Sequence, residues 1–167
     1  MKVKRLFKHF FTTPLQVRRA FSEAVRKAIE EAIATSELHH RGEVRFVVEG
    51  SLDVLPLLRD LSARQRAVQL FSQLGMWDTE QNTGVLVYVL FAEKRLEIVA
   101  DRGIAALVAQ AEWDAISASI SAAFRDGQFE AGAVAGVQRI TALLAMHFPP
   151  ASGGGNPDEL PNRVILL

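Results

Sequence analysis

The sequence predicts an α/β protein, a three-layer α/β/α sandwich built around a small mixed β-sheet. Three apolar runs of strand length, at about 43–49, 85–91 and 95–101, are flanked by segments with helical periodicity. The 85–91 run is apolar or aromatic at every position, which is typical of a strand covered on both faces. A chain of 167 residues can bury a substantial core, so we expect a single α/β domain.

The first half of the chain predicts two helices around the first strand. Residues 13–16 (Thr-Pro-Leu-Gln) fit a capping box with proline at the first helical position, and the apolar spacing behind them predicts a helix to about Leu38. Residues 62–65 fit a second capping box, and Gly75 is a typical helix end. Because a helix separates the first two strands, we expect these strands to be parallel and joined by a right-handed crossover.

The second half predicts a hairpin followed by helices. Residues 92–94 form a short connection, so strands 85–91 and 95–101 are expected to pair antiparallel, with 85–91 in the centre of the sheet. The apolar spacing over 113–124 and 129–144 predicts two further amphipathic helices.

Composition separates both ends of the chain from the middle. Residues 1–12 are basic and amphipathic, and residues 149–167 begin with a Gly- and Pro-rich stretch. We therefore expect an N-terminal segment (1–12), a domain (13–148) and a C-terminal tail (149–167). The apolar end of this tail, 164–167, is expected to pack on its own domain.

Charge and cysteine content exclude several classes of function. Lys+Arg and Asp+Glu are equal at 19 each, so nothing indicates nucleic-acid binding. The absence of cysteine excludes disulfides, thiol nucleophiles and Cys-based metal sites. The apolar runs are far shorter than the ~20 residues that span a bilayer, and the basic start lacks the apolar stretch of a signal peptide. We expect a cytoplasmic protein without a transmembrane helix.

The basic segment 1–12 has one apolar helical face. Its members are Val3, Leu6, Phe7, Phe10 and Phe11, with Lys2, Lys4, Arg5, Lys8 and His9 off that face. Such a helix is expected either to dock on the sheet or on a protein partner, or to lie on an anionic membrane surface.

Three polar segments are expected to meet at one end of the sheet. If the first two strands are parallel, their starts lie together, and the end of the antiparallel third strand lies beside them. The candidate metal ligands at this end are Glu43, Asp78, Glu80, Asn82 and Asp101. Oxygen ligands of this kind suit hard cations such as Ca²⁺ or Mg²⁺.

These candidates have a structural interpretation as well. Asp78, Glu80 and Asn82 alternate like the first ligands of a calcium loop. Thr83 replaces the glycine of that loop and Val89 replaces its bidentate glutamate, so the segment is not an EF-hand and fits an ordinary solvated loop equally well.

Asp101 and Arg102 are the candidate catalytic residues. They precede a short helix, so Asp101 either caps that helix or binds a cation, and Arg102 either pairs with a carboxylate or contacts an anion. The sequence contains no HExxH, GxSxG, Walker or GxGxxG motif, and no nucleophile is evident.

The stretch NTGVLVYVLFAEKRLEIVADRGI at 82–104 resembles the core of the TPM domain family. GEVRFVVE at 42–49 and GMWDTEQNTGV at 75–85 are similar to it as well, while HFP at 147–149 and the closing DELPNRVILL resemble the short, soluble bacterial branch. The resemblance implies an α/β domain in which some relatives bind divalent cations and others are described as acid phosphatases. Thr83 departs from the family, which often has Asn or Asp there.

Residues and resemblance together leave three functions open. The first is a module that binds a divalent cation or a protein partner. The second is a metal-assisted phosphatase, which would need a metal-bound water and groups that stabilise phosphate charge. The third is an accessory protein that acts at a membrane surface through residues 1–12.

Overall fold

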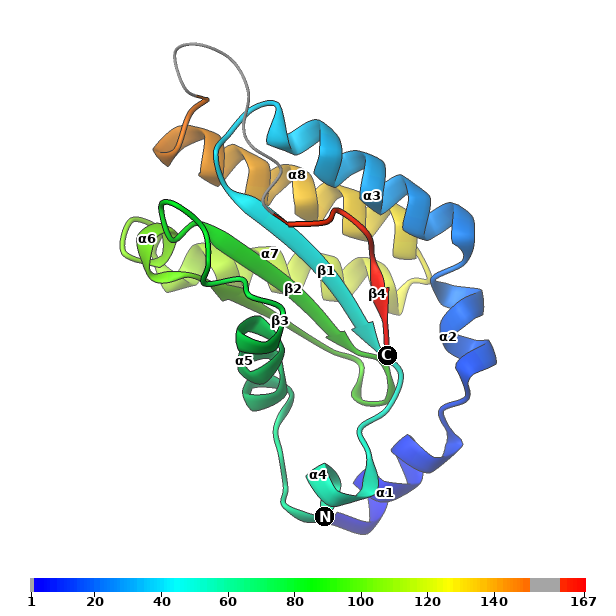
Figure 1. Cartoon of the computed structure of the whole chain (residues 1–167). Coiled ribbons are helices and arrows are strands. Elements are labelled where there is room, and N and C mark those ends of the chain that lie inside the picture. Colours follow the sequence, from blue (N-terminus) through cyan, green and yellow to red (C-terminus); the bar gives the residue numbers. More distant parts are fainter. Residues whose placement is uncertain (1, 151–159) are drawn as a thin grey trace.

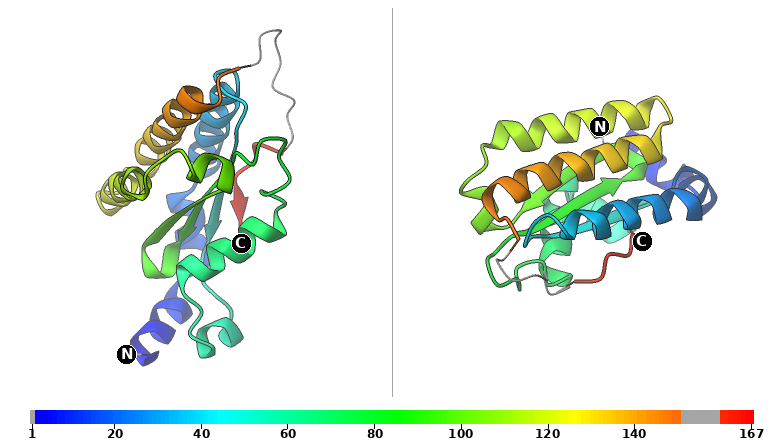
Figure 2. Two further views of the ribbon diagram at one scale, coloured as in Figure 1. Left: turned by 90° about the vertical axis from the view of Figure 1, so that its left-hand side faces the viewer. Right: turned by 90° about the horizontal axis from the view of Figure 1, so that it is seen from above.

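A four-stranded mixed sheet of order β3-β2-β1-β4 lies between two layers of helices in the computed structural model, which describes residues 2–150 and 160–167 (Figures 1 and 2). The strands are β1 Glu43–Glu49, β2 Gly84–Leu90, β3 Arg95–Ala100 and β4 Ile165–Leu166. The helices are α1 Lys2–Phe11, α2 Pro14–Ala20, α3 Glu23–Glu37, α4 Val54–Leu58, α5 Ala63–Gln73, α6 Arg102–Ala105, α7 Gln110–Arg125 and α8 Phe129–His147, with a 3₁₀ turn η1 at Phe91–Glu93.

The strand directions agree with the sequence patterns. β1 and β2 are parallel, with Glu43 opposite Gly84, and β2 and β3 are antiparallel, with Val85 opposite Ala100. Every residue of β2 is buried. The α/β/α fold and the central position of the second strand are confirmed, because a strand apolar on both sides is stable only between two covered faces.

Two hydrophobic cores lie on the two faces of the sheet. α3, α7 and α8 lie side by side over one face, where Val44, Val85 and Ile98 meet Ile33, Ile116 and Ile140. α5 covers the other face, where Leu86 and Tyr88 meet Ala67 and Leu70. Side chains that alternate along a strand thus supply both cores.

Close contact between α7 and α8 depends on two glycines of α8. A Cβ atom at Gly132 would lie 2.6 Å from Ala123 Cβ, and one at Gly136 would lie 2.4 Å from Ile120 Cδ1. These two glycines therefore permit the close approach of α7 and α8, and a larger residue at either position would push the two helices apart.

Both predicted capping boxes are present. Thr13 and Gln16 form one at the start of α2, and Ser62 and Gln65 form the other at the start of α5. α1 is a separate helix that ends at Phe11, as expected from Pro14.

The prediction of one long helix from residue 13 to about Leu38 is wrong, because the helix is interrupted between α2 and α3. Phe21 ends α2 and is fully buried among the rings of Phe46, Phe124 and Phe129. Ser22 then caps α3 by accepting a hydrogen bond from the backbone N–H of Val25. The apolar spacing continues across the break, so the sequence pattern did not reveal it.

The C-terminal end of the chain adds a strand that the pattern did not predict. β4 has only two residues and pairs parallel with β1, Val47 opposite Ile165, while Val164 is buried in the core. The expectation that 164–167 packs on its own domain is confirmed. The Gly- and Pro-rich stretch at the start of the predicted tail lies mostly at 151–159, outside the described residues. In the described part of the chain, no helix is both long and apolar enough to cross a membrane.

Candidate functional site

The expected polar end of the sheet exists and is organised by backbone pairing. Glu43 begins β1 opposite Gly84, and the backbone N–H of Asp101 donates to the carbonyl oxygen of Gly84 at 2.8 Å. Glu43, Gly84 and Asp101 therefore occupy one row across the three strands. The sequence argument that the 101–103 segment lies beside the start of the second strand holds.

Asp101 is a buried carboxylate in which one oxygen accepts a hydrogen bond and the other has no hydrogen-bond partner among the described residues. The residue is 8% exposed, and Oδ1 accepts the backbone N–H of Arg102 at 2.7 Å at the start of α6. Oδ2 is buried and has no hydrogen-bond partner among the described residues. The capping role of Asp101 is therefore present, but it uses only half of the carboxylate, and a buried acceptor without a partner is unfavourable.

Arg102 and Gly103 hold this segment against the preceding loop. Arg102 Nε donates to Asn82 Oδ1 at 3.2 Å, and the Gly103 N–H donates to the Asn82 carbonyl oxygen at 3.0 Å. A Cβ atom at Gly103 would lie 2.3 Å from the Gln81 carbonyl oxygen, so only glycine permits this approach. Asn82 itself has φ of 54°, in the left-handed region that asparagine tolerates better than most residues.

Asp78 and Glu80 do not join Asp101 in a ready-made cage. Both are exposed, whereas Asp101 and Glu43 are buried. Among residues 2–150 and 160–167, no three His, Asp or Glu side chains are close enough together to hold a metal ion. The expected convergence of three carboxylates is therefore not present, because the loop directs its acidic side chains to solvent. The ligand roles of Glu43, Asp78, Glu80, Asn82 and Asp101 stay predictions.

Two further ionisable groups are buried at or near this end of the sheet. His40 has no exposed surface, and its Nδ1 accepts the Gly42 N–H at 3.1 Å. The pKa of His40 is lowered to about 4, mainly by burial; the Gly42 hydrogen bond opposes this shift, and the nearby His39 adds to it. Arg45, 8% exposed, has a pKa lowered by burial, an effect that the neighbouring Glu43 opposes.

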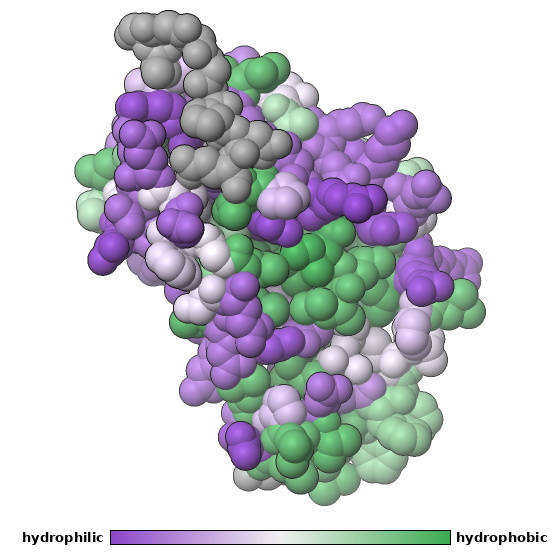
Figure 3. Space-filling model, viewed as in Figure 1, coloured by the Kyte–Doolittle hydropathy of each residue, from purple (hydrophilic) through white to green (hydrophobic). Residues whose placement is uncertain are grey.

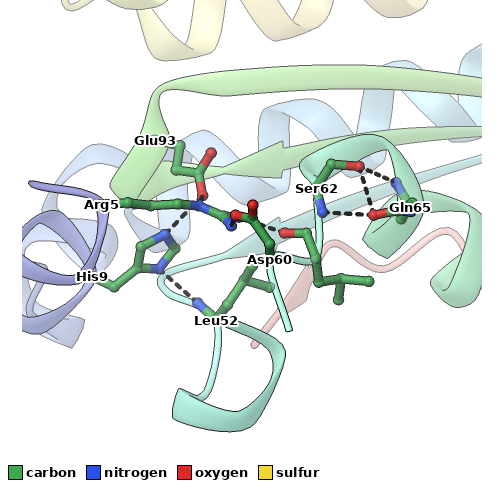
Figure 4. A network of polar contacts seen from close by, with 8 residues as sticks. Arg5, His9, Leu52, Asp60, Ser62, Gln65 and Glu93 are labelled. Carbon is green, nitrogen blue, oxygen red and sulfur yellow. Dashed lines mark hydrogen bonds and ion pairs between the residues drawn. The ribbon is translucent and has the colours of Figure 1, made fainter. Parts of the chain in front are cut away.

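A second polar group, not predicted from the sequence, holds α1 on the domain (Figure 4). Glu93, in the turn between β2 and β3, accepts hydrogen bonds from Arg5 Nε at 2.7 Å and His9 Nε2 at 2.9 Å. Arg5 also pairs with Asp60 at 3.1 Å and donates to the Leu61 carbonyl oxygen. One side of α1 is therefore docked on its own chain, which was one of the two outcomes expected for residues 1–12.

The opposite side of α1 remains exposed. Its apolar side chains lie next to those of α4, and Figure 3 shows hydrophobic residues gathered at this lower end of the molecule. We call this the α1–α4 surface, and it consists of the exposed residues Val3, Phe7, Phe10, Phe11, Val54, Leu55 and Leu58. A groove of about 560 Å³ separates the two helices, with Phe7, Phe10 and Val54 among its lining residues. Contiguous apolar surface of this kind marks an interaction site more often than chance.

A buried ionic group under α5 has a structural role. Arg66 contacts both carboxylate oxygens of Glu49, at 2.8 and 2.9 Å, and the Tyr88 hydroxyl donates to Glu49 Oε2 at 2.6 Å. Burial and the bond to Glu49 together raise the pKa of Tyr88. The group ties α5 to the sheet, because Arg66 lies on α5 whereas Glu49 and Tyr88 lie on β1 and β2.

Comparisons with known proteins agree with this fold. A sequence model of the TPM domain matches residues 17–143, most of the chain. No curated protein matches the sequence significantly. Among solved structures, the NMR structure of the BA42 protein from the psychrophilic bacterium Bizionia argentinensis is similar, with 31% identity and a TM-score of 0.75. That match covers 87% of this chain and 94% of the other. The chain therefore belongs to the TPM domain family.

Proposed function

We propose that this TPM domain is a membrane-surface module that binds anionic lipid through the α1–α4 surface. The observation that carries the proposal is the exposure of Phe7, Phe10 and Phe11, at 56%, 83% and 63%, on a helix whose other side is fixed to the domain. A docked helix presents its apolar face without first having to fold at the membrane, which lowers the entropic cost of binding.

Charge favours an anionic surface over a neutral one. The first 22 residues contain six Lys or Arg and no Asp or Glu. Lys4 and Lys8 are exposed on α1, and Arg18 and Arg19 are exposed on α2. An amphipathic helix with lysines beside bulky apolar residues is typical of proteins that lie in the headgroup region of a bilayer.

The apolar contribution should exceed the electrostatic one. Full burial of a Phe side chain contributes about 1.5–3 kcal/mol, and a basic residue near an anionic membrane contributes about 1 kcal/mol. Three Phe side chains therefore outweigh Lys4 and Lys8, even if they are only partly inserted. Salt should weaken binding, whereas loss of the aromatic side chains should abolish it.

Sedimentation with lipid vesicles tests the proposal. The wild-type chain should bind vesicles that contain phosphatidylglycerol and bind pure phosphatidylcholine more weakly. The double variant Phe10→Gln with Phe11→Gln should lose binding, since glutamine keeps the helix but not the apolar face. The matched control is Leu38→Gln with Leu107→Gln, two exposed apolar residues outside the α1–α4 surface, at 74% and 53%, which should bind like wild type.

Three outcomes would overturn the membrane proposal. The first is no binding of wild type to anionic vesicles, and the second is equal binding by the Phe10 and Phe11 variant. The third is self-association or capture of a protein partner through the same face without vesicle binding, which would assign the α1–α4 surface to a protein. Ultracentrifugation of wild type and variant without lipid distinguishes a second copy.

Divalent-cation binding at Asp101 is the second candidate, and the partnerless Oδ2 supports it. The residues fit a cation that takes one buried carboxylate and keeps several waters, which is the usual behaviour of Mg²⁺ in proteins. Asp101 would supply the buried ligand, and Asn82 and Glu43 lie in the neighbouring segments. Asp78 and Glu80 would have to turn inward or act through water. A cation would also remove the cost of the partnerless oxygen.

A titration with Ca²⁺ and Mg²⁺ followed by backbone NMR tests this candidate. Shifts confined to 39–43, 78–84 and 101–104, lost in Asp101→Asn, are the expected result. Shifts that are unchanged in Asp101→Asn would reject Asp101 as the ligand. Phosphatase activity would be indicated only by metal-dependent turnover that both Asp101→Asn and Arg102→Ala abolish in folded protein. Glu112→Gln, an exposed carboxylate on α7, is a matched control.

A further inference from the structure

A cavity opens between the β2–β3 turn and the α7–α8 turn, at the end of the sheet opposite Asp101. Its volume is about 300 Å³, at the small end of the range for ligand pockets. The lining residues are Val89, Phe91, Lys94, Arg95, Leu96, Ser121, Phe124, Arg125 and Phe129. The lining contains no acidic residue, and neither the sheet-end site nor the α1–α4 surface includes any part of it.

The inner part of the cavity is apolar and is lined by aromatic rings that pack against one another. Phe91, Phe124 and Phe129 are half-buried, and their rings contact one another, with Phe124 and Phe129 centroids 5.2 Å apart and Phe91 and Phe129 6.4 Å apart. The buried ring of Phe21 supports Phe124 and Phe129 from behind at 5.6 and 5.3 Å. Because these rings are held in place, the apolar space is formed before any ligand enters.

The rim of the cavity is positively charged. Lys94, Arg95 and Arg125 are exposed, and none of the three makes a side-chain hydrogen bond or ion pair within the described part of the chain. Lys94 has φ of 52°, so the turn holds it in the left-handed region. Asp126, next to Arg125, is exposed and is not part of the lining. The cavity therefore has two chemically different ends, an apolar interior and a rim that carries three unpaired cations.

We infer that this cavity binds a small amphipathic carboxylate, such as a medium-chain fatty acid. The acyl chain would lie against Phe91, Phe124 and Phe129, and the carboxylate would contact Arg95 and Arg125, whose planar guanidinium groups match its geometry. The limited volume restricts the ligand to a short or medium chain. This inference does not depend on lipid binding by the α1–α4 surface, because the two sites share no residue.

Titration of the full chain with decanoate, below the concentration at which micelles form, tests the inference by backbone NMR. Decanoate should shift residues 89–96 and 121–129 in a saturable manner. Decanol has the same chain without the charge, and acetate has the charge without the chain, so both should bind at least about 10-fold more weakly. Equal binding of decanol would show an apolar void without headgroup recognition, and equal binding of acetate or phosphate would show only an anion site. Either result overturns the inference.

Two matched pairs of variants separate the two ends of the ligand. Ser121→Leu fills the cavity from α7 and should abolish decanoate binding, while Ser119→Leu, two residues away and exposed, should not. Arg95→Gln with Arg125→Gln should weaken binding about 10-fold or more, while Arg59→Gln with Arg163→Gln, at two exposed arginines outside the cavity, leaves it unchanged. Circular dichroism checks that each variant is folded. Wild-type affinity in folded Ser121→Leu, or in the folded Arg95 and Arg125 variant, would overturn the inference.

Discussion

Glu93 accepts a hydrogen bond of 2.9 Å from His9, although 84 residues separate the two in the sequence. The other ring nitrogen of His9, Nδ1, accepts the Leu52 backbone N–H at 2.9 Å. Because Nδ1 accepts, the proton of the neutral ring lies on Nε2 and points to Glu93. His9 therefore joins α1, the segment that follows β1 and the β2–β3 turn at one point (Figure 4).

Glu93→Gln should loosen α1 without unfolding the domain. Burial would raise the pKa of Glu93, but the bonds from His9 and Arg5 outweigh it and lower the pKa below the ordinary 4.5. The ionised form is therefore the one that stabilises, by about 1–3 kcal/mol for such charge-assisted bonds. Hydrogen exchange over residues 2–11 should become faster in the variant. Glu130→Gln, an exposed carboxylate on α8, should exchange like wild type.

The same bond predicts release of α1 in acid. A carboxylate with a lowered folded pKa contributes stability that is complete above its unfolded pKa and is lost as the pH falls through the folded value. In wild type, the protection factors over residues 2–11, which correct for the slower intrinsic exchange in acid, should fall below about pH 4.5, while those of the variant should change little there. An equal response in both proteins would show that Glu93 does not hold the helix.

Because of His40, the free energy of unfolding should decrease as the pH is lowered from 6.5 to 4. Its folded pKa of about 4 lies below the ordinary 6.5, so only the unfolded chain binds a proton in this range. The shift corresponds to about 3 kcal/mol of unfolding free energy, present above pH 6.5 and lost progressively as the pH falls to 4. Urea unfolding at several pH values measures this slope. His40→Gln should have a lower stability at pH 7 and a flatter slope. An unchanged slope would show that another group titrates.

Tyr88→Phe and Glu49→Gln should lower the free energy of unfolding by different amounts. Tyr88→Phe removes one donor, and Glu49 keeps its two bonds to Arg66, so the expected loss is about 1–2 kcal/mol. Glu49→Gln leaves the half-buried Arg66 guanidinium without its counter-charge. The expected loss of unfolding free energy is about 3–5 kcal/mol. Chemical unfolding measures both. Gln69→Ala, on the exposed side of α5, should stay within about 0.5 kcal/mol of wild type. The reverse order would contradict this account of the group.

The amides of residues 85–90 should be among the slowest to exchange. Residues 85–90 of β2 are paired on both sides, with β1 and β3, and every residue of β2 is buried. β3 has β2 as its only partner among the described strands, so the amides on its free side should exchange faster. Faster exchange in β2 than in β3 would contradict the sheet order described above.

The sequence by itself determined the α/β/α fold, the strand directions and most helix starts. These features depend on local patterns, such as the unbroken apolar run of β2 and the capping boxes at Thr13 and Ser62. Asp101 was also placed correctly beside the start of β2, because the pairing of parallel and antiparallel strands fixes which ends meet.

Only the tertiary structure decided which side chains meet. The direction of Asp78 and Glu80 depends on the path of a loop, and the sequence pattern does not specify it. His9 contacts Glu93, and Phe91 and Phe129 line one cavity, although the residues of each pair lie far apart in the chain. The spacing of residues in the sequence therefore does not predict either contact. Local patterns fix the elements, because each repeats within a few residues, whereas a site depends on how those elements pack.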